Sequence, residues 1–339
     1  SGLYEAHPDW FVSDNGSIPL CGPQNLWEDP YWGTRCAFTD YLPAFDFYND
    51  EARAWSIDDA IWWAKEYGID GYRLDAIKHV PLSWLTELRS SLSQSFSEPE
   101  GDRFYLVGET FSYDDRDLLR SFVDPGTMLD GQFDFPFKAR LCEALFSFQM
   151  GLDDFSGWMD SNDGFYGEGS IMTTWIGNHD IPRPIHFASG QIGNCREGSH
   201  SGNSWTSSYN QPQDAAPYER LGLAFAVMLT NPGIPLIYYG DEVGLAGGGD
   251  PDNRRMMPWA PSDLNPHQEN LRNLVSQLGQ IRQENKVMTR GERRTISVGD
   301  DTWVYRMEGC AGDSPDITIA INRSDWSKSV YIPAGNFEE

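Results

Sequence analysis

Acidic residues end four apolar runs of this 339-residue sequence. They are Asp75 in GYRLDAIKH, Glu109 in YLVGET, Asp180 in WIGNHD, and the pair Asp241 and Glu242 in YYGDE. Carboxylates that gather at the carboxyl ends of successive parallel strands are typical of the catalytic face of a barrel. Polar strand ends with a structural role are more often Ser, Thr or Asn, so the sequence predicts a site that works by carboxylate chemistry.

An arginine and an aspartate lie two positions apart in the first of these runs. Because side chains alternate along a strand, Arg73 and Asp75 point to the same side. Burying both groups is costly unless they pair with each other. Two interpretations remain open: a structural salt bridge, or an ion pair that a catalytic site uses.

The elements that must position these residues alternate between strand and helix patterns. Apolar runs bounded by turn signals predict strands within 69–75, 104–109, 128–135, 171–180 and 234–242. Apolar residues at helical spacing predict helices within 58–67, 82–92, 137–146 and 219–230. The alternation predicts parallel strands with crossover helices. From residue 295 or so, short alternating runs at 302–307, 316–322 and 329–333 predict a small antiparallel domain.

Composition narrows the classes of partner. The chain is long enough, at 40% hydrophobic residues, to bury a large core in one large domain with a smaller one beside it. Its formal charge of -26 would repel nucleic acid phosphates and anionic lipids. The sequence contains no run of 18 apolar residues, so no membrane span is predicted. Thirteen tryptophans suit either a sugar-binding surface or a Trp-rich core, and both interpretations stay open.

The five cysteines show neither a CxxC motif nor zinc-ligand spacing. Cys21 and Cys36 bracket a loop rich in Gly, Pro and Trp and are expected to form a disulfide. A disulfide favours an exported protein, secreted or periplasmic, although a cytoplasmic location stays open. Cys142 lies in an apolar helical stretch and is expected as a buried thiol. His186 and His200 belong to no motif and are expected at the surface.

Three ordered motifs resemble the signature regions of a known family. GYRLDAIKH is similar to the second signature region of the α-amylase family, glycoside hydrolase family 13, LVGETF to the third and TTWIGNHD to the fourth. The segments YLPAFDF, GIPLIYYGDE and GGGDPDNRRMMPW are similar to supporting segments, so the match spans 41–259. The resemblance implies an α/β fold, a (β/α)8 TIM barrel over 1–290, followed by a small, partial antiparallel β-sandwich domain over 291–339.

The resemblance also implies catalytic roles. Asp75 would be the nucleophile, Glu109 the general acid/base and Asp180 the residue that binds the hydroxyls of the distorted sugar. Arg73 would hold Asp75 ionised from the same strand face, and His179 would hydrogen-bond the same ring as Asp180. The acid role of Glu109 requires a raised pKa, which nearby carboxylates can provide.

Further substrate contacts follow from the same resemblance. Lys78 and His79 would lie on the leaving-group side of the cleaved bond. Asp250 and Arg254, in GDPDNRR, are similar to a pair that holds sugar units further along the donor side, with a loop salt bridge as the alternative. The chemistry needs no cofactor, and a structural calcium ion would use the backbone carbonyl of His79.

The first signature region of the family is absent. HPDWF, at 7–11, resembles the segment that directly follows that region, so the chain is expected to hold barrel strands four to eight. Five strands cannot close a barrel and would leave two strand edges open. Strands one to three would therefore come from an upstream segment or another chain.

The expected function is that of a retaining hydrolase that cleaves α-1,4-glucosidic bonds of starch, maltodextrins or related α-glucans through a covalent glycosyl-enzyme intermediate. A transglycosylase, or a cyclodextrin or oligo-α-glucoside hydrolase of the same family, is the alternative that the DPDNR loop favours. A non-catalytic carbohydrate-binding relative is a third class, against which the intact Asp75, Glu109 and Asp180 argue. The choice between α-1,4 and α-1,6 bonds stays open.

Overall fold

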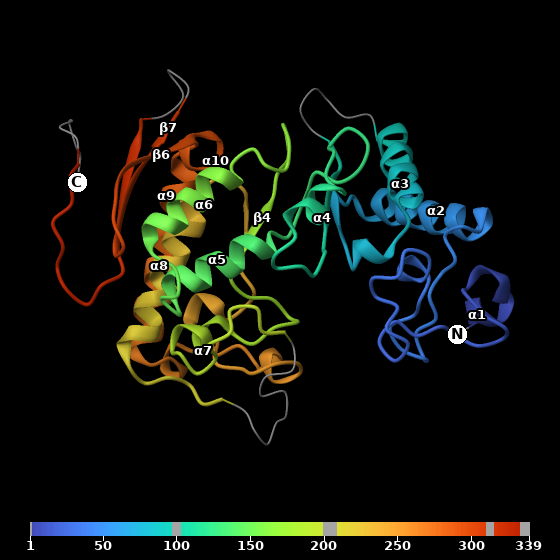
Figure 1. Ribbon diagram of the computed structural model, residues 1–339, viewed down its shortest axis with the longest axis horizontal. Helices are drawn as coiled ribbons and strands as arrows, with labels where there is room; N and C mark the ends of the chain where they lie inside the picture. Colours follow the sequence, from blue (N-terminus) through green and yellow to red (C-terminus); the bar gives the residue numbers. More distant parts are fainter. Residues whose placement is uncertain (1, 97–102, 199–208, 310–314, 333–339) are drawn as a thin grey trace. The chain divides into compact units, whose positions relative to one another are not determined.

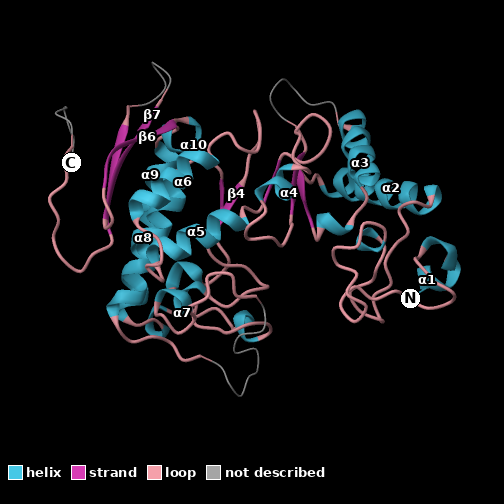
Figure 2. Ribbon diagram, viewed as in Figure 1, coloured by secondary structure: helices cyan, strands magenta, loops and turns pink. Residues whose placement is uncertain are grey.

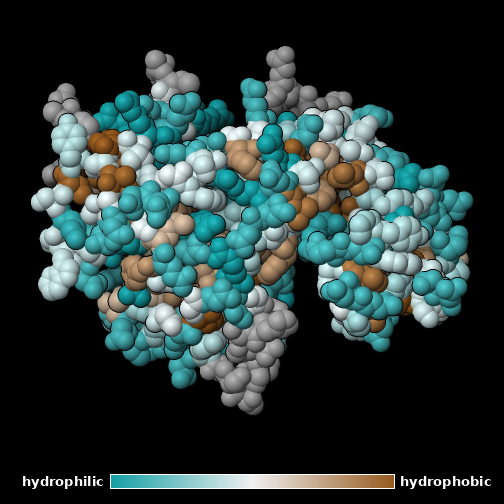
Figure 3. Space-filling model, in the orientation of Figure 1, coloured by the Kyte–Doolittle hydropathy of each residue, from teal (hydrophilic) through white to brown (hydrophobic). Residues whose placement is uncertain are grey.

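The computed structural model describes residues 2–96, 103–198, 209–309 and 315–332. The chain forms two compact units (Figure 1). The first unit comprises 1–133 with 166–172, and the second comprises 134–165 with 173–339. Hydrophilic residues cover most of the face drawn in Figure 3, in line with the formal charge of -26. In the described ranges, no helix has the length and apolar composition needed to cross a bilayer.

The first unit is built around a parallel sheet of order β1-β2-β3 (Figure 2). Its elements are α1 (Gly2–Ala6), η1 (Pro8–Trp10), η2 (Trp32–Thr34), α2 (Asp50–Tyr67), β1 (Gly71–Leu74), η3 (Ile77–His79), α3 (Leu82–Ser95), β2 (Tyr105–Gly108), α4 (Arg116–Arg120) and β3 (Gly131–Gln132). Helix α3 connects β1 to β2, as a crossover between parallel strands requires.

Local sequence signals set the entry into β1. The side chain of Asn49 caps α2 by accepting from the backbone N–H groups of Glu51 and Ala52, and Gly68 ends the helix in the left-handed conformation. Ile57 of α2 and Leu88 of α3 are buried with Leu106 of β2 in one apolar cluster. The helices therefore cover the sheet and hold the carboxyl end of β1 in place.

A buried carboxylate joins β2 to the elements around it. Asp130 is fully buried, and its Oδ2 accepts from Arg89 Nη2 at 2.5 Å and from the Leu106 N–H at 2.7 Å. Arg89 also donates to the carbonyls of Met128 and Phe104, at 2.7 Å each. Because a buried charge is tolerated only when it is paired and hydrogen-bonded, this set of bonds fixes β2 against α3 and the chain before β3.

The second unit holds a parallel strand pair, a helical layer and an antiparallel sheet. Its elements are α5 (Phe135–Leu145), α6 (Leu152–Asn162), β4 (Thr173–Trp175), α7 (Pro184–Ala188), α8 (Ala215–Thr230), β5 (Ile234–Leu236), η4 (Asp241–Val243), η5 (Asp252–Arg254), η6 (Pro261–Asp263), α9 (Pro266–Glu284), α10 (Val287–Arg290), β6 (Glu292–Val298), β7 (Thr302–Glu308) and β8 (Ile317–Asn322). Strand β4 pairs with β5 in parallel, and β6-β7-β8 are antiparallel. Helices α8 and α9 lie side by side, and buried residues of α5, α8 and β7 share one core (Figure 1).

The predicted alternation of strands and helices is confirmed. Each of the predicted parallel runs contains one of the strands β1 to β5, and the short runs at 302–307 and 316–322 contain most of β7 and β8. The prediction of a strand at 329–333 is wrong for its described part, since 329–332 form no strand. A strand needs a ladder partner, and within the described ranges this segment has none.

The four cysteines within the described ranges form two disulfides. Cys21 and Cys36 are joined, with their Cα atoms 5.0 Å apart. The prediction of a buried thiol at Cys142 is wrong, because Cys142 is bonded to Cys195, with Cα atoms 5.7 Å apart. The partners are 53 positions apart, and they meet because the loop after α7 returns to α5, where Lys138 Nζ donates to the Cys195 carbonyl at 2.7 Å. His200, expected at the surface, lies outside the described residues.

Candidate active site

Asp75 directly follows β1, at the point where the chain leaves the sheet. The residue after it, Ala76, has a φ of 45°, in the left-handed region that residues other than glycine rarely adopt. This turn leaves the Asp75 side chain 70% exposed at the carboxyl end of the strand. Arg73 forms an ion pair with it, and its guanidinium lies 5.5 Å from the ring centre of Phe133. The predicted pairing of Arg73 with Asp75 is therefore present.

Glu109 occupies the corresponding position after β2. The last register pair of β1 and β2 joins Leu74 to Gly108, and the Glu109 N–H donates to the Leu74 carbonyl at 2.9 Å. Glu109 is only 6% exposed, and its Oε2 accepts from the Ala76 N–H at 3.2 Å. Adjacent strands lie about 4.8 Å apart, so Asp75 and Glu109 leave neighbouring strand ends side by side. One carboxylate faces solvent and the other is buried.

Lys78 and His79 follow in η3 and are tied to the loop that the Cys21–Cys36 disulfide closes. Lys78 Nζ pairs with Glu28 Oε1 at 3.0 Å. His79 donates from Nδ1 to the Gly33 carbonyl at 2.7 Å. Burial lowers the pKa of His79, which favours the neutral imidazole. Both side chains therefore have structural partners beside the carboxyl end of β1.

His179 and Asp180 lie in the second unit, in the segment that follows β4. The Asp180 N–H donates to Asn178 Oδ1 at 2.9 Å, which forms a tight turn at this point. His179 Nε2 lies 3.3 Å from Asp180 Oδ2, and the two side chains are 41% and 38% exposed. Both functional groups are thus accessible to a ligand, as the predicted roles require.

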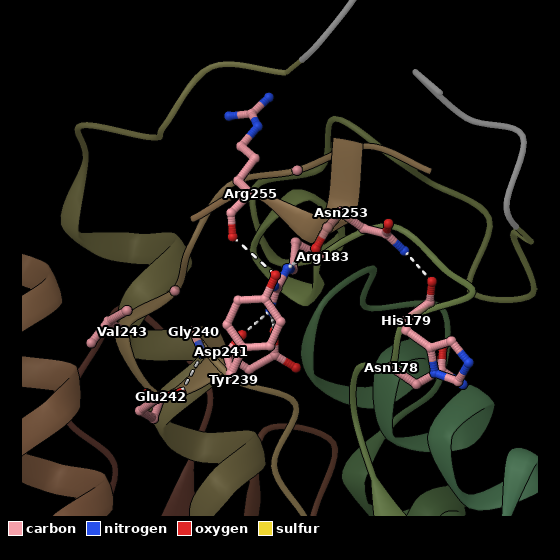
Figure 4. Close-up of polar contacts among 12 residues, drawn as sticks. Asn178, His179, Arg183, Tyr239, Gly240, Asp241, Glu242, Val243, Asn253 and Arg255 are labelled. Atoms are coloured by element: carbon pink, nitrogen blue, oxygen red, sulfur yellow. Dashed lines mark hydrogen bonds and ion pairs between the residues drawn. The ribbon is translucent and has the colours of Figure 1, made fainter. Parts of the chain in front are cut away.

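A buried polar network lies behind this segment, and sequence reasoning missed its main members (Figure 4). Arg183 is fully buried and donates to the Tyr239 carbonyl, to Asp241 Oδ1 at 2.9 Å and to the Asn253 carbonyl at 2.8 Å. Burial raises the pKa of Asp241 to about 7, against the opposing effect of the Arg183 guanidinium. Asp241 ends a predicted strand run, but its carboxylate is 1% exposed and serves this network.

The expectation that His186 lies at the surface is wrong, because it is fully buried in α7. Its Nε2 accepts from the Gly247 N–H at 2.9 Å, and its Nδ1 donates to Gln191 Oε1 at 2.6 Å. Burial lowers the pKa of His186 to about 4, so the imidazole is neutral at physiological pH. No motif around the residue signals this role, since Gly247 is 61 positions away.

Asp250 and Arg254 form an ion pair in the loop after η4. Arg254 Nε lies 2.6 Å from Asp250 Oδ1, and the side chains are 47% and 46% exposed. In the same loop, Asp252 is buried and accepts from both Arg255 and the Gly248 N–H. The loop salt bridge is present, and its exposure leaves both charged groups open to a ligand.

The sequence-predicted residues divide between the units. Arg73, Asp75, Lys78, His79 and Glu109 lie in the first unit, and His179, Asp180, Asp250 and Arg254 in the second. The calcium ion expected at the His79 carbonyl stays a prediction. Among the described residues, no group of three or more His, Cys, Asp or Glu side chains is placed to hold a metal ion.

Comparison with known proteins places this arrangement in a family. A family model of the alpha-amylase catalytic domain matches residues 5–291. A cyclomaltodextrinase of Geobacillus thermopakistaniensis is 24% identical over 299 residues, which are 88% of this chain and 44% of that protein. A maltogenic alpha-amylase of Bacillus acidopullulyticus is 28% identical in an alignment of 299 positions that covers 87% of this chain and 44% of that protein.

A solved structure gives the same result for the fold. The alpha-amylase of Geobacillus thermoleovorans, complexed with acarbose, superposes with a TM-score of 0.72 at 26% identity, over 95% of this chain and 62% of that one. The chain thus spans less than half the length of the two curated relatives and under two thirds of this structure. Because the family model matches well over half of it, the chain belongs to the α-amylase family, glycoside hydrolase family 13, whose catalytic domain is a (β/α)8 barrel.

Proposed function

We propose that this chain carries the catalytic carboxylates of a retaining glycoside hydrolase that cleaves α-1,4-glucosidic bonds in starch, maltodextrins or related α-glucans. The observation that carries the proposal is the placement of Asp75 and Glu109 directly after the register pair Leu74 and Gly108. Retaining enzymes need two carboxyl groups about 5 to 5.5 Å apart, and adjacent parallel strands are about 4.8 Å apart. Inverting enzymes need a wider separation to admit a water molecule.

In the first step, an Asp75 oxygen attacks the anomeric carbon while the glycosidic C–O bond breaks. Glu109 gives its proton to the leaving oxygen, and a glycosyl ester of Asp75 forms. In the second step, water attacks the anomeric carbon, Glu109 takes the proton from that water, and the ester bond breaks. One water molecule is consumed in the cycle, both enzyme groups return to their starting states, and no cofactor is needed.

The other residues have supporting roles in this proposal. Arg73 orients the Asp75 carboxylate through their ion pair, and Asp180 with His179 binds the hydroxyls of the distorted ring. Lys78 and His79 contact the leaving-group side. Asp250 and Arg254 hold sugar units further along the donor side, which their exposure permits.

The stereochemistry of the first product tests the reaction class. Two successive displacements at the anomeric carbon each invert it, so the α-anomer should be released first. NMR of a maltodextrin digest within the first minutes measures this before mutarotation. The β-anomer as first product would mean direct attack by water and would exclude Asp75 as a nucleophile.

A transglycosylase or cyclodextrin hydrolase is the second candidate. The Asp250–Arg254 loop favours it, as do relatives named cyclomaltodextrinase and cyclomaltodextrin glucanotransferase. Chromatography of the products separates the candidates. Hydrolysis gives oligosaccharides shorter than the substrate, whereas transfer to sugar acceptors also gives longer ones.

The fold also points to elements beyond this chain. We infer that β1 to β5 are barrel strands four to eight, that β6 to β8 belong to a partial β-sandwich, and that strands one to three come from an upstream segment or another chain. In the described ranges, β1 pairs only with β2 and β5 only with β4, which leaves one edge of each open. Ile234 and Ile237, in and beside β5, remain 40% exposed, although barrel strands are normally buried. The polypeptide or assembly that unites strands one to three with 1–339 is called the complete enzyme below.

This inference predicts that a polypeptide limited to 1–339 is inactive and aggregates or oligomerises, whereas the complete enzyme is active. Open strand edges and exposed apolar side chains recruit other chains, and part of the catalytic face is missing. Native mass measurement and a starch assay on both proteins decide the matter. A 38.3 kDa monomer that cleaves starch would overturn it.

We also propose that the protein works outside the cell or in the periplasm. Two disulfides, Cys21–Cys36 and Cys142–Cys195, favour an oxidising compartment, outside the cell or in the periplasm. Fractionation of the source cells tests this, and activity confined to the cytoplasm would contradict it.

A further inference from the structure

The side chain of Asn253 holds the backbone on both sides of Asp180. Its Nδ2 donates to the carbonyl of His179 at 2.7 Å (Figure 4). The same Nδ2 donates to the carbonyl of Ile181 at 3.0 Å. Asn253 is fully buried, whereas the Asp180 side chain is 38% exposed. One buried amide thus grips the residues immediately before and after an accessible carboxylate.

The chemistry of the amide explains why this contact is specific. A carbonyl oxygen only accepts hydrogen bonds, and the NH2 group of Asn has two N–H donors, so it can satisfy two carbonyls at once. Leaving a buried carbonyl without a hydrogen-bond donor costs about 1 to 3 kcal/mol of free energy. Without the Asn253 amide, the backbone conformation of 179–181 would therefore be less stable. The direction in which the Asp180 side chain points depends on that backbone conformation.

Asn253 is itself held in place by a hydrogen bond from Arg183. Arg183 donates from Nε to the Asn253 carbonyl at 2.8 Å and from Nη1 to Asp241 Oδ1 at 2.9 Å, and the Arg183 N–H donates to the Gly247 carbonyl at 2.9 Å. These groups are nearly all excluded from solvent, and hydrogen bonds to charged groups are stronger than neutral ones. The loop that carries Asn253 is therefore fixed to the chain segment that carries Asp180 at several points.

We propose that Asn253 is a positioning residue that acts through Asp180, by fixing the backbone from which the Asp180 carboxylate reaches the sugar ring. The inference rests on the proposed function, in which Asp180 binds the distorted ring. Asn253 does not touch substrate, since it is buried behind the segment 179–181. Because the transition state requires close placement of groups, a displacement of about 1 Å at Asp180 can lower the rate about 100-fold.

A purely structural role for Asn253 makes a different prediction. Asn231 offers a matched control, because it is also buried and its Nδ2 donates to the Val227 carbonyl at 2.7 Å and to the Tyr305 hydroxyl oxygen at 3.3 Å. It lies where α8 ends, and its Oδ1 accepts from Arg293 Nη1 at 2.8 Å, so its side-chain partners Val227, Tyr305 and Arg293 all lie outside the segment 178–183. If Asn253 served stability alone, Asn253→Ala and Asn231→Ala would have the same consequences.

The experiment compares these two variants in the complete enzyme, with maltodextrin as substrate and at a temperature below both unfolding midpoints. We expect both substitutions to lower the melting temperature. Only Asn253→Ala should lower kcat, by about 100-fold with KM changed less than about threefold, because Asp180 acts mainly in the transition state. Asn231→Ala should leave both constants within about threefold of the parent. Equal effects of the two substitutions on kcat would overturn the proposal.

A double-mutant cycle tests whether Asn253 acts through Asp180. In an Asp180→Asn background, Asn253→Ala should cost less than about threefold, since the group that it positions is already disabled. A further loss near 100-fold would show that the two residues act independently and would overturn the inference while leaving the proposed function intact. If Asp180→Asn alone keeps the parental rate, the proposed function of Asp180 fails, and the inference fails with it.

A second variant keeps the test decisive if Asn253→Ala does not fold. Asn253→Ser leaves space for a water molecule that can donate to the two carbonyls in place of the amide. It is taken through the same cycle with the same expected signs, because a water bridge holds the backbone less firmly than the amide. Parental kcat in a folded Asn253→Ser variant would count against positioning by the amide.

Discussion

The complete enzyme with Asp75→Asn is expected to hydrolyse maltodextrin roughly 10,000-fold more slowly than the parent. The substitution removes the negative charge of the nucleophile with little change in volume, so the covalent step is lost and the fold is kept. Asp75 is 70% exposed and its side chain pairs with Arg73 at the surface, so we expect the variant to fold. Stopped assays of reducing ends over several hours cover this range of rates.

The same strand offers a matched control. Asp70 lies just before β1, is exposed, and uses its backbone carbonyl to accept from the Tyr105 N–H at 3.0 Å. Asp70→Asn makes the same chemical change at the opposite end of the strand and should keep nearly all activity, because the reacting groups gather at the carboxyl ends. More than a tenth of the parental rate in Asp75→Asn would refute the nucleophile assignment.

The sequence was sufficient to predict the elements around Asp75 and Glu109, because their signals are local. An apolar helix pattern, a left-handed cap at Gly68 and a short apolar run follow one another along the chain, and each depends on neighbouring residues. The helix α2 nevertheless starts at Asp50, ahead of the predicted 58–67, because the Asn49 cap sets its first turn.

Residues that act over long separations were predicted less well. Arg183 contacts Asn253 70 positions away and Asp241 58 positions away, and neither pairing leaves a periodic pattern. Cys142 and His186 were misplaced for the same reason, since their partners Cys195 and Gly247 are remote in sequence. Burial of these groups follows from tertiary packing, which a single sequence does not display.

Asp241 shows that a carboxylate at a strand end can have a structural role instead of a catalytic one. The rule that carboxylates gather at strand ends selected it together with Asp75, Glu109 and Asp180. In the structure, its 1% exposure and its bond to Arg183 assign it to the support of the Asp180 segment. A strand-end carboxylate can face a substrate or a buried arginine, and only the contacts tell the two apart.

Asp75 is exposed and Glu109 is buried, and we propose different roles for them. Glu109→Gln is therefore expected to lose activity to an extent that depends on the substrate. On maltodextrin, whose leaving oxygen must be protonated, the loss should be about 1,000-fold. On an α-glucosyl fluoride the leaving group departs without a proton, so the first step should remain within about tenfold of the parent. The rate of fluoride release in the first turnover, compared with the rate of maltodextrin cleavage, measures the difference.

The second step gives this variant a further signature. Glu109 also activates the water that releases the sugar from Asp75, so Glu109→Gln should accumulate the glycosyl ester when the fluoride forms it quickly. One fluoride ion per active site should appear in a burst, followed by slow turnover. Asp75→Asn is the matched comparison, because it blocks the first step and should lose activity on both substrates without a burst. A fluoride burst in Glu109→Gln that is slowed as much as the cleavage of maltodextrin would show that Glu109 transfers no proton to the leaving group, and the division of roles between the buried and the exposed carboxylate would then be wrong.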